Sequence, residues 1–454
     1  MMKDTARKTA LQILNALDKE QQTLDAVLEE KLARMPLDKR DIALIYAIVY
    51  GVLRWRSRLD YYIACFSKSG ISHIRPDILN ILRMGIFQML FTDRIPESAA
   101  VNTSVNLAKE NAKKSRIAGF VNGLLRNVQR SHQHIRFPDP RKDPLRALAV
   151  QESFPQWMIE RWLKRFGFQE TQELCKAHNR IAPLHLRCNT LKITRDELLR
   201  ILNSAGGQAE AGIYTPESIA VSGLPSPVEL PAFEQGYFQV QDGAAQLAGR
   251  MFGPRPGEKV LDACAGLGGK TGHMAQMMKN QGHILAVDHR GEKLARLQSE
   301  TARLGISIAE TAVYDLNHRA DPARHGTFDR ILLDAPCSGL GVIRRNPDSK
   351  WVLSKKNLQR YQNRQVCFLE NLTPLLKPSG LLFYAVCSNE AEENEDVVSA
   401  FLSRHPEFCI EKKHPELPET ARSLLTKEGY MRTFPHLHGT DGFFAAGFRK
   451  SGIR

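Results

Sequence analysis

The sequence predicts an α/β fold of the doubly wound type for its C-terminal half, preceded by an all-α segment and a small α+β segment. Three observations predict this division. Helical periodicity continues through residue 135 without alternating strands, the proline-rich run "FPDPRKDP" follows at Phe137, and from Gln235 onward apolar runs alternate with helical stretches. We therefore expect three domains, at residues 1–138, 139–235 and 236–454.

The composition of the chain indicates which kind of molecule it binds. The 454 residues include 63 Lys and Arg against 49 Asp and Glu, which gives a net charge of +14. Such an excess favours a polyanion, nucleic acid first and an anionic membrane surface second. The eight cysteines lack the close paired spacing of a zinc site and the density of a secreted disulfide scaffold. We expect reduced thiols in a cytoplasmic protein and no metal.

The start of the chain and its most apolar run bear on membrane association. The first twenty residues carry charges where a signal peptide needs an uninterrupted apolar stretch, and Ala6, Ile13 and Leu17 follow helical spacing. The run "IALIYAIVYGVL" from Ile42 covers 12 residues, whereas a membrane span needs about 20. These features predict a soluble protein without membrane association, and no obligate protein partner is evident.

The N-terminal segment is predicted to be helical and basic. In "RIAGFVNGLLRNVQR" from Arg116 one apolar face is formed by Ile117, Phe120, Val121, Leu124, Leu125 and Val128. Gly119 and Gly123, four residues apart, would let a neighbouring helix come close. Between residues 101 and 136 one acid, Glu110, accompanies seven basic residues: Lys109, Lys113, Lys114, Arg116, Arg126, Arg130 and Arg136. The pattern indicates either a solvated face or an RNA contact.

The connecting segment mixes a helix, "QWMIERWLKRFGF", with short strands, "LHLRCNTLK" and "IAVSG", and shows no catalytic chemistry. The C-terminal segment is predicted to contain strands in "KVLDACAG", "HILAVD", "AETAVYD", "FDRILLDAP", "GLLFYAVCS" and "GFFAAGFRK". In such a sheet the ligand lies across the carboxyl ends of the strands, where every motif of interest falls.

A glycine-rich loop follows the first of these strands, in "VLDACAGLGGKTGHMAQ". A P-loop needs glycine where Cys264 stands, and a dinucleotide fingerprint needs glycine where Thr271 stands, so a nucleoside ligand fits better. Asp288, 22 residues after Gly266, ends the next strand and could bind both ribose hydroxyls or cap a helix. Asp315 ends the third and could meet an adenine amino group. Loop and acids together look like the S-adenosylmethionine site of a Rossmann-like methyltransferase.

Several further motifs carry a family resemblance. The stretches "LLDAPCSGLGVIRRNPDSKW", "YAVCSNEAEENE" and "FPHLHGTDGFFAAGF" resemble the RNA cytosine-5 methyltransferases of the bacterial Fmu/Sun type. At the N-terminus, "GVLRWRSRLDYYI", "RMGIFQMLFTDRIPESAAVNTSVNLAK" and "FVNGLLRNVQR" resemble the NusB-like domain that such proteins carry in front, and "LRCNTLK" and "GYFQVQDGAAQLAG" are similar to the connecting segment. The resemblance implies 5-methylcytosine formation in 16S ribosomal RNA, with S-adenosylmethionine as methyl donor and RNA or a small-subunit particle as partner.

The resemblance also implies a cofactor site. Its residues are Cys264, Ala265, Gly266, Leu267, Gly268, Gly269 and Lys270 of the loop, together with Asp288, Asp315 and Asp334. The family's loop usually reads Cys-Ala-Ala-Pro-Gly-Gly-Lys, so Gly266 and Leu267 replace Ala-Pro here. Losing proline and gaining glycine loosens the turn, which bears on cofactor affinity.

Two cysteines at strand ends, Cys337 and Cys387, suit this chemistry. Cytosine C5 becomes nucleophilic once a thiolate has added to C6, and a second group must then help expel the thiolate. The residues alone leave the two roles open. The resemblance implies that Cys387 is the nucleophile, that Cys337 assists release, and that Asp334 contacts the cytosine ring near N3.

The remaining motifs near the cysteines receive simpler predictions. Arg344, Arg345, Lys350 and Trp351 are predicted to hold an RNA backbone and an extruded base. Glu392 and Glu393 are predicted to be acids of a first helical turn. Two functions remain from different classes: a methyltransferase that acts through a covalent Cys387 adduct, or a non-catalytic RNA-binding assembly factor that retains the fold.

Overall fold

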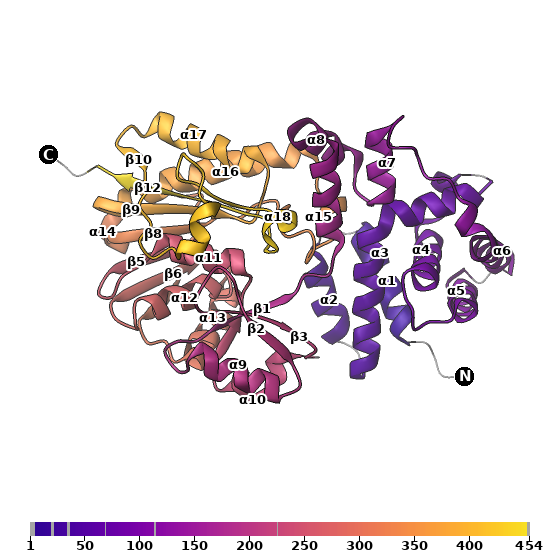
Figure 1. Ribbon diagram of the computed structural model, residues 1–454, viewed down its shortest axis with the longest axis horizontal. Coiled ribbons are helices and arrows are strands. Elements are labelled where there is room, and N and C mark those ends of the chain that lie inside the picture. The colour runs from indigo at the N-terminus through magenta and orange to yellow at the C-terminus, as the bar shows by residue number, and fades with distance from the viewer. Residues whose placement is uncertain are drawn as a thin grey trace. The chain divides into compact units, whose positions relative to one another are not determined.

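The computed structural model describes residues 5–19, 22–33, 37–68, 70–112, 115–224 and 226–451. Lys113 and Lys114 of the predicted basic run lie outside these ranges. The chain divides into two compact units (Figure 1). Unit 1 comprises Met1–Arg180 and Ile343–Leu353, and unit 2 comprises Ile181–Val342 and Ser354–Arg454. The domain boundaries expected from the sequence stay a prediction.

Unit 1 is built from helices, and the part of it that the structure describes contains no strand. Its α-helices are α1 (Thr5–Lys19), α2 (Leu24–Ala33), α3 (Lys39–Phe66), α4 (Pro76–Leu90), α5 (Glu97–Ala112), α6 (Ser115–Ser131), α7 (Pro144–Gln151), α8 (Gln156–Asn179) and α15 (Ser349–Val352), with 3-10 turns η1 (Ile71–His73) and η2 (His132–His134). The apolar run from Ile42 lies in α3, whose buried residues join one core with those of α1, α4 and α6. The all-α prediction for the N-terminal segment is confirmed.

Helix α6 departs from the predicted pattern in two respects. Val121, Leu124 and Val128 are buried, but Phe120 is 37% exposed. Phe120 lies about 100° around the helix from Val121 and so falls outside the apolar stripe. A Cβ atom added at Gly119 or Gly123 would meet nothing within 4 Å. The predicted close approach of a second helix at these glycines is therefore wrong.

The segment Ile343–Leu353, which follows the Cys337 motif in sequence, packs within unit 1. Lys350 is fully buried, and its Nζ donates to the carbonyl oxygens of Arg54 and Ser153 at 2.7 and 2.8 Å. The Nε1 of Trp351 donates to the Leu53 carbonyl oxygen at 2.6 Å. Burial lowers the pKa of Lys350 well below its usual value. The prediction that Lys350 holds RNA is wrong, because protein carbonyls enclose its ammonium.

Unit 2 begins with a small antiparallel sheet in the order β2-β3-β1-β4. Its strands are β1 (Leu184–Cys188), β2 (Gln208–Ala211), β3 (Ser218–Ser222) and β4 (Phe238–Val240), accompanied by α9 (Arg195–Ser204), α10 (Pro231–Glu234) and the 3-10 turn η3 (Pro227–Glu229). Both strands expected in the connecting segment are present as β1 and β3. We call residues 181–242 the small domain.

The large sheet has the order β10-β12-β9-β8-β5-β6-β7, and β11 pairs with β12. Its strands are β5 (Lys259–Ala263), β6 (His283–Asp288), β7 (Ala309–Val313), β8 (Phe328–Asp334), β9 (Leu376–Val386), β10 (Phe408–Ile410), β11 (Met431–Thr433) and β12 (Phe443–Lys450). Strands β5 to β9 pair with one another in parallel, and β12 is antiparallel to β9. The six strands predicted for the C-terminal segment are all confirmed.

Helices cover this sheet, and its alternating side chains enter two separate cores (Figure 1). The helices of this part are α11 (Gly243–Phe252), α12 (Gly269–Met277), α13 (Gly291–Leu304), α14 (Pro322–His325), α16 (Lys355–Leu372), α17 (Glu395–Arg404) and α18 (Pro435–His438), with 3-10 turns η4 (Thr373–Leu375), η5 (Ala391–Glu393) and η6 (Glu419–Leu424). The chain builds outward from β5 through β6 and β7, then returns to the other side of β5 with β8 and β9. Ligands bind at such a switch point, outside the carboxyl ends of the strands.

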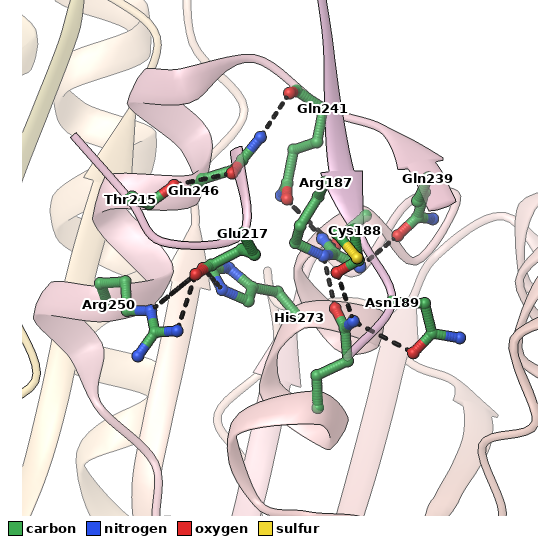
Figure 2. A network of polar contacts seen from close by, with 12 residues as sticks. Arg187, Cys188, Asn189, Thr215, Glu217, Gln239, Gln241, Gln246, Arg250 and His273 are labelled. Atoms are coloured by element: carbon green, nitrogen blue, oxygen red, sulfur yellow. Dashed lines mark hydrogen bonds and ion pairs between the residues drawn. The ribbon is translucent and has the colours of Figure 1, made fainter. Parts of the chain in front are cut away.

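Buried polar side chains join the small domain to the helices of the large sheet (Figure 2). Glu217 lies between two donors, because Arg250 Nη2 approaches its carboxylate at 2.7 Å and His273 Nε2 at 2.6 Å. Burial raises the pKa of Glu217, but the hydrogen bonds and charges of His273 and Arg250 outweigh burial and hold it below its ordinary value. Burial lowers the pKa of His273 to about 4. Glu217 is therefore ionised and His273 is neutral, with its Nε2–H donating.

This arrangement predicts a pH dependence of stability. An unfolded histidine titrates near pH 6.5, so between pH 6.5 and 4 the unfolded chain binds a proton that folded His273 excludes. The free energy of unfolding should therefore fall as the pH drops through this window, by up to about 3 kcal/mol from this group. In His273→Gln, urea unfolding measured from pH 7 to 4.5 should lose that part of the slope.

The exposed His318 provides the matched control, since His318→Gln should keep the slope of the wild type. A His273→Gln protein with an unchanged slope would contradict the assignment.

Among the described residues, no helix combines the length and hydropathy needed to cross a membrane.

Candidate active site

A tight loop joins β5 to α12 and contains the predicted cofactor residues 264–270. Gly266 and Gly268 both have positive φ, +58° and +84°, a region that side-chain-bearing residues seldom adopt. A Cβ atom at Gly268 would also come within 2.7 Å of Leu297 Cγ. Cys264 has φ +64° and packs against the core, and its burial raises its pKa. The positive φ at position 266 favours glycine over a residue that carries a side chain.

Asp288 is the last residue of β6 and forms a hydrogen bond with this loop. The carboxylate is buried, and its Oδ2 accepts a hydrogen bond from the Gly266 amide at 3.1 Å. Its Oδ1 accepts from the Arg290 amide at 2.9 Å, just before α13 begins. One oxygen of Asp288 therefore lies against the loop, and the other closes a turn at Arg290, the N-cap residue of α13, which has no side-chain cap. The ribose contact stays a prediction.

Asp262, which the sequence did not single out, lies in β5 below the same loop. Its side chain is fully buried, and Oδ2 accepts from the Thr271 hydroxyl at 2.6 Å. Oδ1 has no hydrogen-bond partner within the described part of the chain. The pKa of Asp262 is raised to about 7, chiefly by burial, with Asp334 and Asp288 acting in the same direction and Thr271 and Lys270 against it. A buried acceptor without a donor is costly, so a ligand that donates a hydrogen bond there would stabilise it.

Lys270 and Asp334 form an ion pair across the switch point. Lys270 Nζ lies 2.6 Å from Asp334 Oδ2 and 5.2 Å from the centre of the Phe443 ring. Lys270 opens α12 after the glycine-rich loop, whereas Asp334 ends β8. The structure therefore brings together one residue predicted for the cofactor and one predicted for the base.

The two predicted catalytic cysteines lie side by side. Cys337 follows β8 and Cys387 follows β9, and these strands are parallel neighbours. The two Sγ atoms are 3.3 Å apart. The hydrogen bond to Cys387 and burial raise the pKa of Cys337 well above that of a free thiol. The two thiols therefore lie within hydrogen-bond distance of each other, and either sulfur could be the donor.

Glu393 holds the two cysteine loops together. Its carboxylate is fully buried and accepts from the Ser338 amide at 2.7 Å, from the Ser388 hydroxyl at 2.5 Å and from the Ser338 hydroxyl. Gln365 Nε2 on α16 donates to it at 3.2 Å. Burial raises the pKa of Glu393 despite these hydrogen bonds. Glu393 lies in the first turn of η5, as predicted, and its carboxylate in addition binds the residues that follow both cysteines.

A glycine contact fixes the same loops from the other side. The Gly341 amide donates to the Cys387 carbonyl oxygen at 3.0 Å, and the Gly442 amide donates to the Gly341 carbonyl oxygen at 2.9 Å. A Cβ atom at Gly341 would lie 2.0 Å from the Gly442 carbonyl oxygen. The "DGFF" stretch before β12 thus supports the cysteine pair through backbone contact.

Two predicted cofactor residues remain outside these contacts. Leu267 is 53% exposed at the tip of the loop. The Asp315 side chain is 48% exposed, and its Oδ1 accepts from the amide and the side chain of Asn317 at 3.0 and 2.7 Å. The backbone hydrogen bond from Asn317 holds the pKa of Asp315 below its usual value. Their roles stay predictions. Within the described ranges, no group of three or more His, Cys, Asp or Glu side chains could hold a metal.

Comparison with known proteins gives three consecutive family matches. Residues 4–130 match the NusB family, residues 154–228 match the ferredoxin-like domain of RsmF/B-like methyltransferases, and residues 250–449 match the 16S rRNA methyltransferase RsmB/F family. A Bacillus subtilis protein named probable ribosomal RNA small subunit methyltransferase B is 34% identical over 457 residues, covering 100% of each chain.

Solved structures give the same picture. The crystal structure of PH0851 is 27% identical, covers 99% of both chains and has a TM-score of 0.80. A methyltransferase homologue from Pyrococcus horikoshii is 28% identical, with a TM-score of 0.58 over 68% of this chain and 99% of its own. The matches thus extend over the helical, small and α/β parts of the sequence.

Proposed function

Because the chain belongs to the RsmB/F family of 16S rRNA methyltransferases, we propose that it methylates C5 of a 16S rRNA cytosine through a covalent bond from Cys387 to C6. The family and the Rossmann-like methyltransferase fold predicted from the sequence are confirmed, and so is S-adenosylmethionine as the cofactor. The base, the atom methylated and the adduct are the proposal.

The residues of the loop fit this cofactor. S-adenosylmethionine presents ribose hydroxyls and an ammonium group as donors, and a carboxylate as acceptor. Asp288 at the end of β6 and the unpartnered Oδ1 of Asp262 supply acceptors. The first turn of α12 begins at Gly269 and supplies amide donors of the kind that bind anions. When bound there, the cofactor supplies an electrophilic methyl group.

One observation supports the covalent mechanism above the others: the 3.3 Å approach of two cysteine sulfurs beside an Asp334–Lys270 ion pair. A thiolate at Cys387 can add to C6 of the base, which breaks the C5–C6 double bond and makes C5 nucleophilic. Asp334 can accept a hydrogen bond from the exocyclic amino group of the ring, and from N3 once N3 takes up a proton from solvent as the thiolate adds, which stabilises the adduct. Once C5 carries the methyl group, loss of its proton restores the double bond and expels Cys387.

The raised pKa of Cys337 supports the division of roles. A thiol that stays protonated is a poor nucleophile but a competent hydrogen-bond donor. Cys337 can stabilise the sulfur of Cys387 when that sulfur carries negative charge, both before addition and when it leaves. Removing Cys337 should therefore slow release more than attack.

The NusB-family match over residues 4–130 and the net charge of +14 support RNA binding by unit 1. In α5 and α6, Lys109, Arg116, Arg126 and Arg130 are the described members of the basic run predicted to contact RNA. Phosphate contacts of this kind make affinity fall steeply with salt.

The test uses the full chain, S-adenosylmethionine and 16S rRNA, with nucleosides analysed by mass spectrometry. We expect 5-methylcytosine. RNA carrying 5-fluorocytosine should also leave a covalent complex on a denaturing gel, because fluorine blocks the loss of the C5 proton. A methylated base other than 5-methylcytosine would refute the proposed position, whereas RNA binding without any methylation would favour a non-catalytic assembly factor.

A further inference from the structure

Arg187 of the small domain is buried against the cofactor loop. It is 1% exposed and lies in β1. Its Nη1 donates to the Gly269 carbonyl oxygen at 2.7 Å, its Nε to Gln276 Oε1 at 2.6 Å and its Nη2 to Gln239 Oε1 at 2.6 Å. A further hydrogen bond from Nη1 reaches Gln241 (Figure 2). One guanidinium thus joins the small sheet, the segment after it and both ends of α12.

The contact with Gly269 connects this hydrogen-bond network to the residues of the candidate active site. Gly269 is the last glycine of the loop and the first residue of α12, and its neighbour Lys270 reaches Asp334. Gln241 Nε2 also donates to the Gly269 carbonyl oxygen, at 3.3 Å. The place where the loop ends and the helix begins is therefore set by side chains that precede the large sheet in sequence.

The Arg187 guanidinium packs closely against helix α12 at Gly272. A Cβ atom at Gly272 would lie 2.9 Å from Arg187 Nη2 and 3.0 Å from Gln239 Oε1. On the opposite side, Gln276 Nε2 donates to the Cys188 carbonyl oxygen at 2.9 Å and to Asn189 Oδ1 at 3.1 Å. Helix α12 is thereby bound to the "RCN" stretch of the small domain in both directions.

The guanidinium of Arg187 makes its four hydrogen bonds to uncharged groups. Its four acceptors are amide or carbonyl oxygens, none of which carries a negative charge. Burial lowers the pKa of Arg187 to about 9, although Glu217 and Glu300 oppose the shift. A buried cation beside the first turn of a helix increases the attraction of that turn for an anion.

We propose that Arg187 is a positioning residue for S-adenosylmethionine, so that the small domain forms part of the cofactor site rather than a spacer. It acts through the Gly269 carbonyl oxygen, which fixes the loop amides, and through its charge near the anionic end of the cofactor. This inference rests on the cofactor of the family and is independent of which base is methylated.

The test measures the Kd of S-adenosylmethionine by calorimetry, without RNA, for the full chain and two arginine variants. Arg187→Lys keeps a charge but cannot make four hydrogen bonds from one planar group. Arg303→Lys is the matched control, because Arg303 on α13 donates to the Phe238 carbonyl oxygen at 3.0 Å and to that of Phe233 but does not contact the loop. Both changes weaken the attachment of the small domain.

We expect Arg187→Lys to raise the Kd at least about 10-fold and Arg303→Lys to leave it within about 2-fold, at temperatures where both proteins are folded. If the Kd rose equally in both variants, Arg187 would have only a structural role. An unchanged Kd in Arg187→Lys would also overturn the proposal.

Gly272→Ala provides an independent variant if Arg187→Lys fails to fold. Alanine in a helix interior is favoured over glycine by about 1 kcal/mol, so helix α12 itself is not weakened. Its Cβ atom displaces the guanidinium instead. The Kd should rise as in Arg187→Lys, and a Kd equal to that of the wild type would contradict the proposed role. Because no RNA is present, a failure to make 5-methylcytosine would leave this result unaffected.

Discussion

Cys387→Ala is expected to abolish both methylation and the covalent RNA adduct, whereas Cys337→Ala is expected to accumulate the adduct. Without a thiolate to add to C6, cytosine C5 stays a poor nucleophile, and the rate should fall at least about 10³-fold. Without Cys337, attack remains possible, but the sulfur of Cys387 loses the thiol that lies 3.3 Å away and assists its departure. Nucleoside mass spectrometry and a denaturing gel measure the two quantities on the same samples.

Cys409→Ala is the control, because Cys409 is exposed on β10 and should methylate like the wild type. If the two active-site variants exchange their behaviour, the roles of the cysteines are reversed. If Cys387→Ala still forms product, the covalent mechanism is wrong.

Glu393→Ala is expected to lower kcat/KM by about 10²-fold or more, although the hydrogen bonds of Glu393 go to Ser338, Ser388 and Gln365 and not to a cysteine sulfur. Its removal leaves the Ser338 amide without its acceptor in a buried site and takes one of the two acceptors of Gln365 Nε2, which keeps the Pro336 carbonyl oxygen. Each such loss costs about 1–3 kcal/mol, and the loops that carry Cys337 and Cys387 are free to separate. Steady-state kinetics and urea unfolding should be measured together.

Glu393→Gln separates positioning from negative charge. The side-chain carbonyl of glutamine can still accept from the Ser338 amide, and its amino group can donate to serine hydroxyls that reverse their direction. Activity should therefore recover to within about 10-fold of the wild type. Glu392→Ala, one residue away, should change little. Recovery with Gln at 393 supports a positioning role, whereas loss equal to Glu393→Ala would mean that the ionised carboxylate itself is needed.

The sequence predicted the strands that show a clear apolar pattern and the residues that lie at their ends. Strands β6, β8 and β9 contain apolar runs, so their ends, and with them Asp288, Asp334, Cys337 and Cys387, could be placed in advance. The three-residue strands β10 and β11 are too short to show a period of two. The strand ends at which the candidate site lies were therefore predictable, and the short strands β10 and β11 were not.

Residues whose partners are distant in sequence escaped prediction. Glu393 binds Ser338, and Arg187 binds Gly269, 55 and 82 residues apart. Nothing in their local patterns distinguishes them from an acid of a helical turn or a charge in an exposed strand. Lys350 was misread for the same reason, since its acceptors at residues 54 and 153 become neighbours only after folding.

The packing of Ile343–Leu353 within unit 1 restricts how this protein can be divided. A fragment of residues 181–454 would keep Lys350 and Trp351 but lose the carbonyls of Leu53, Arg54 and Ser153 that bind them. A fragment ending at residue 180 would leave those carbonyls without donors. The helical unit and the methyltransferase unit are therefore not interchangeable modules. Any gene fusion or exchange that preserves function must carry matched versions of both the first 180 residues and this short stretch after Cys337.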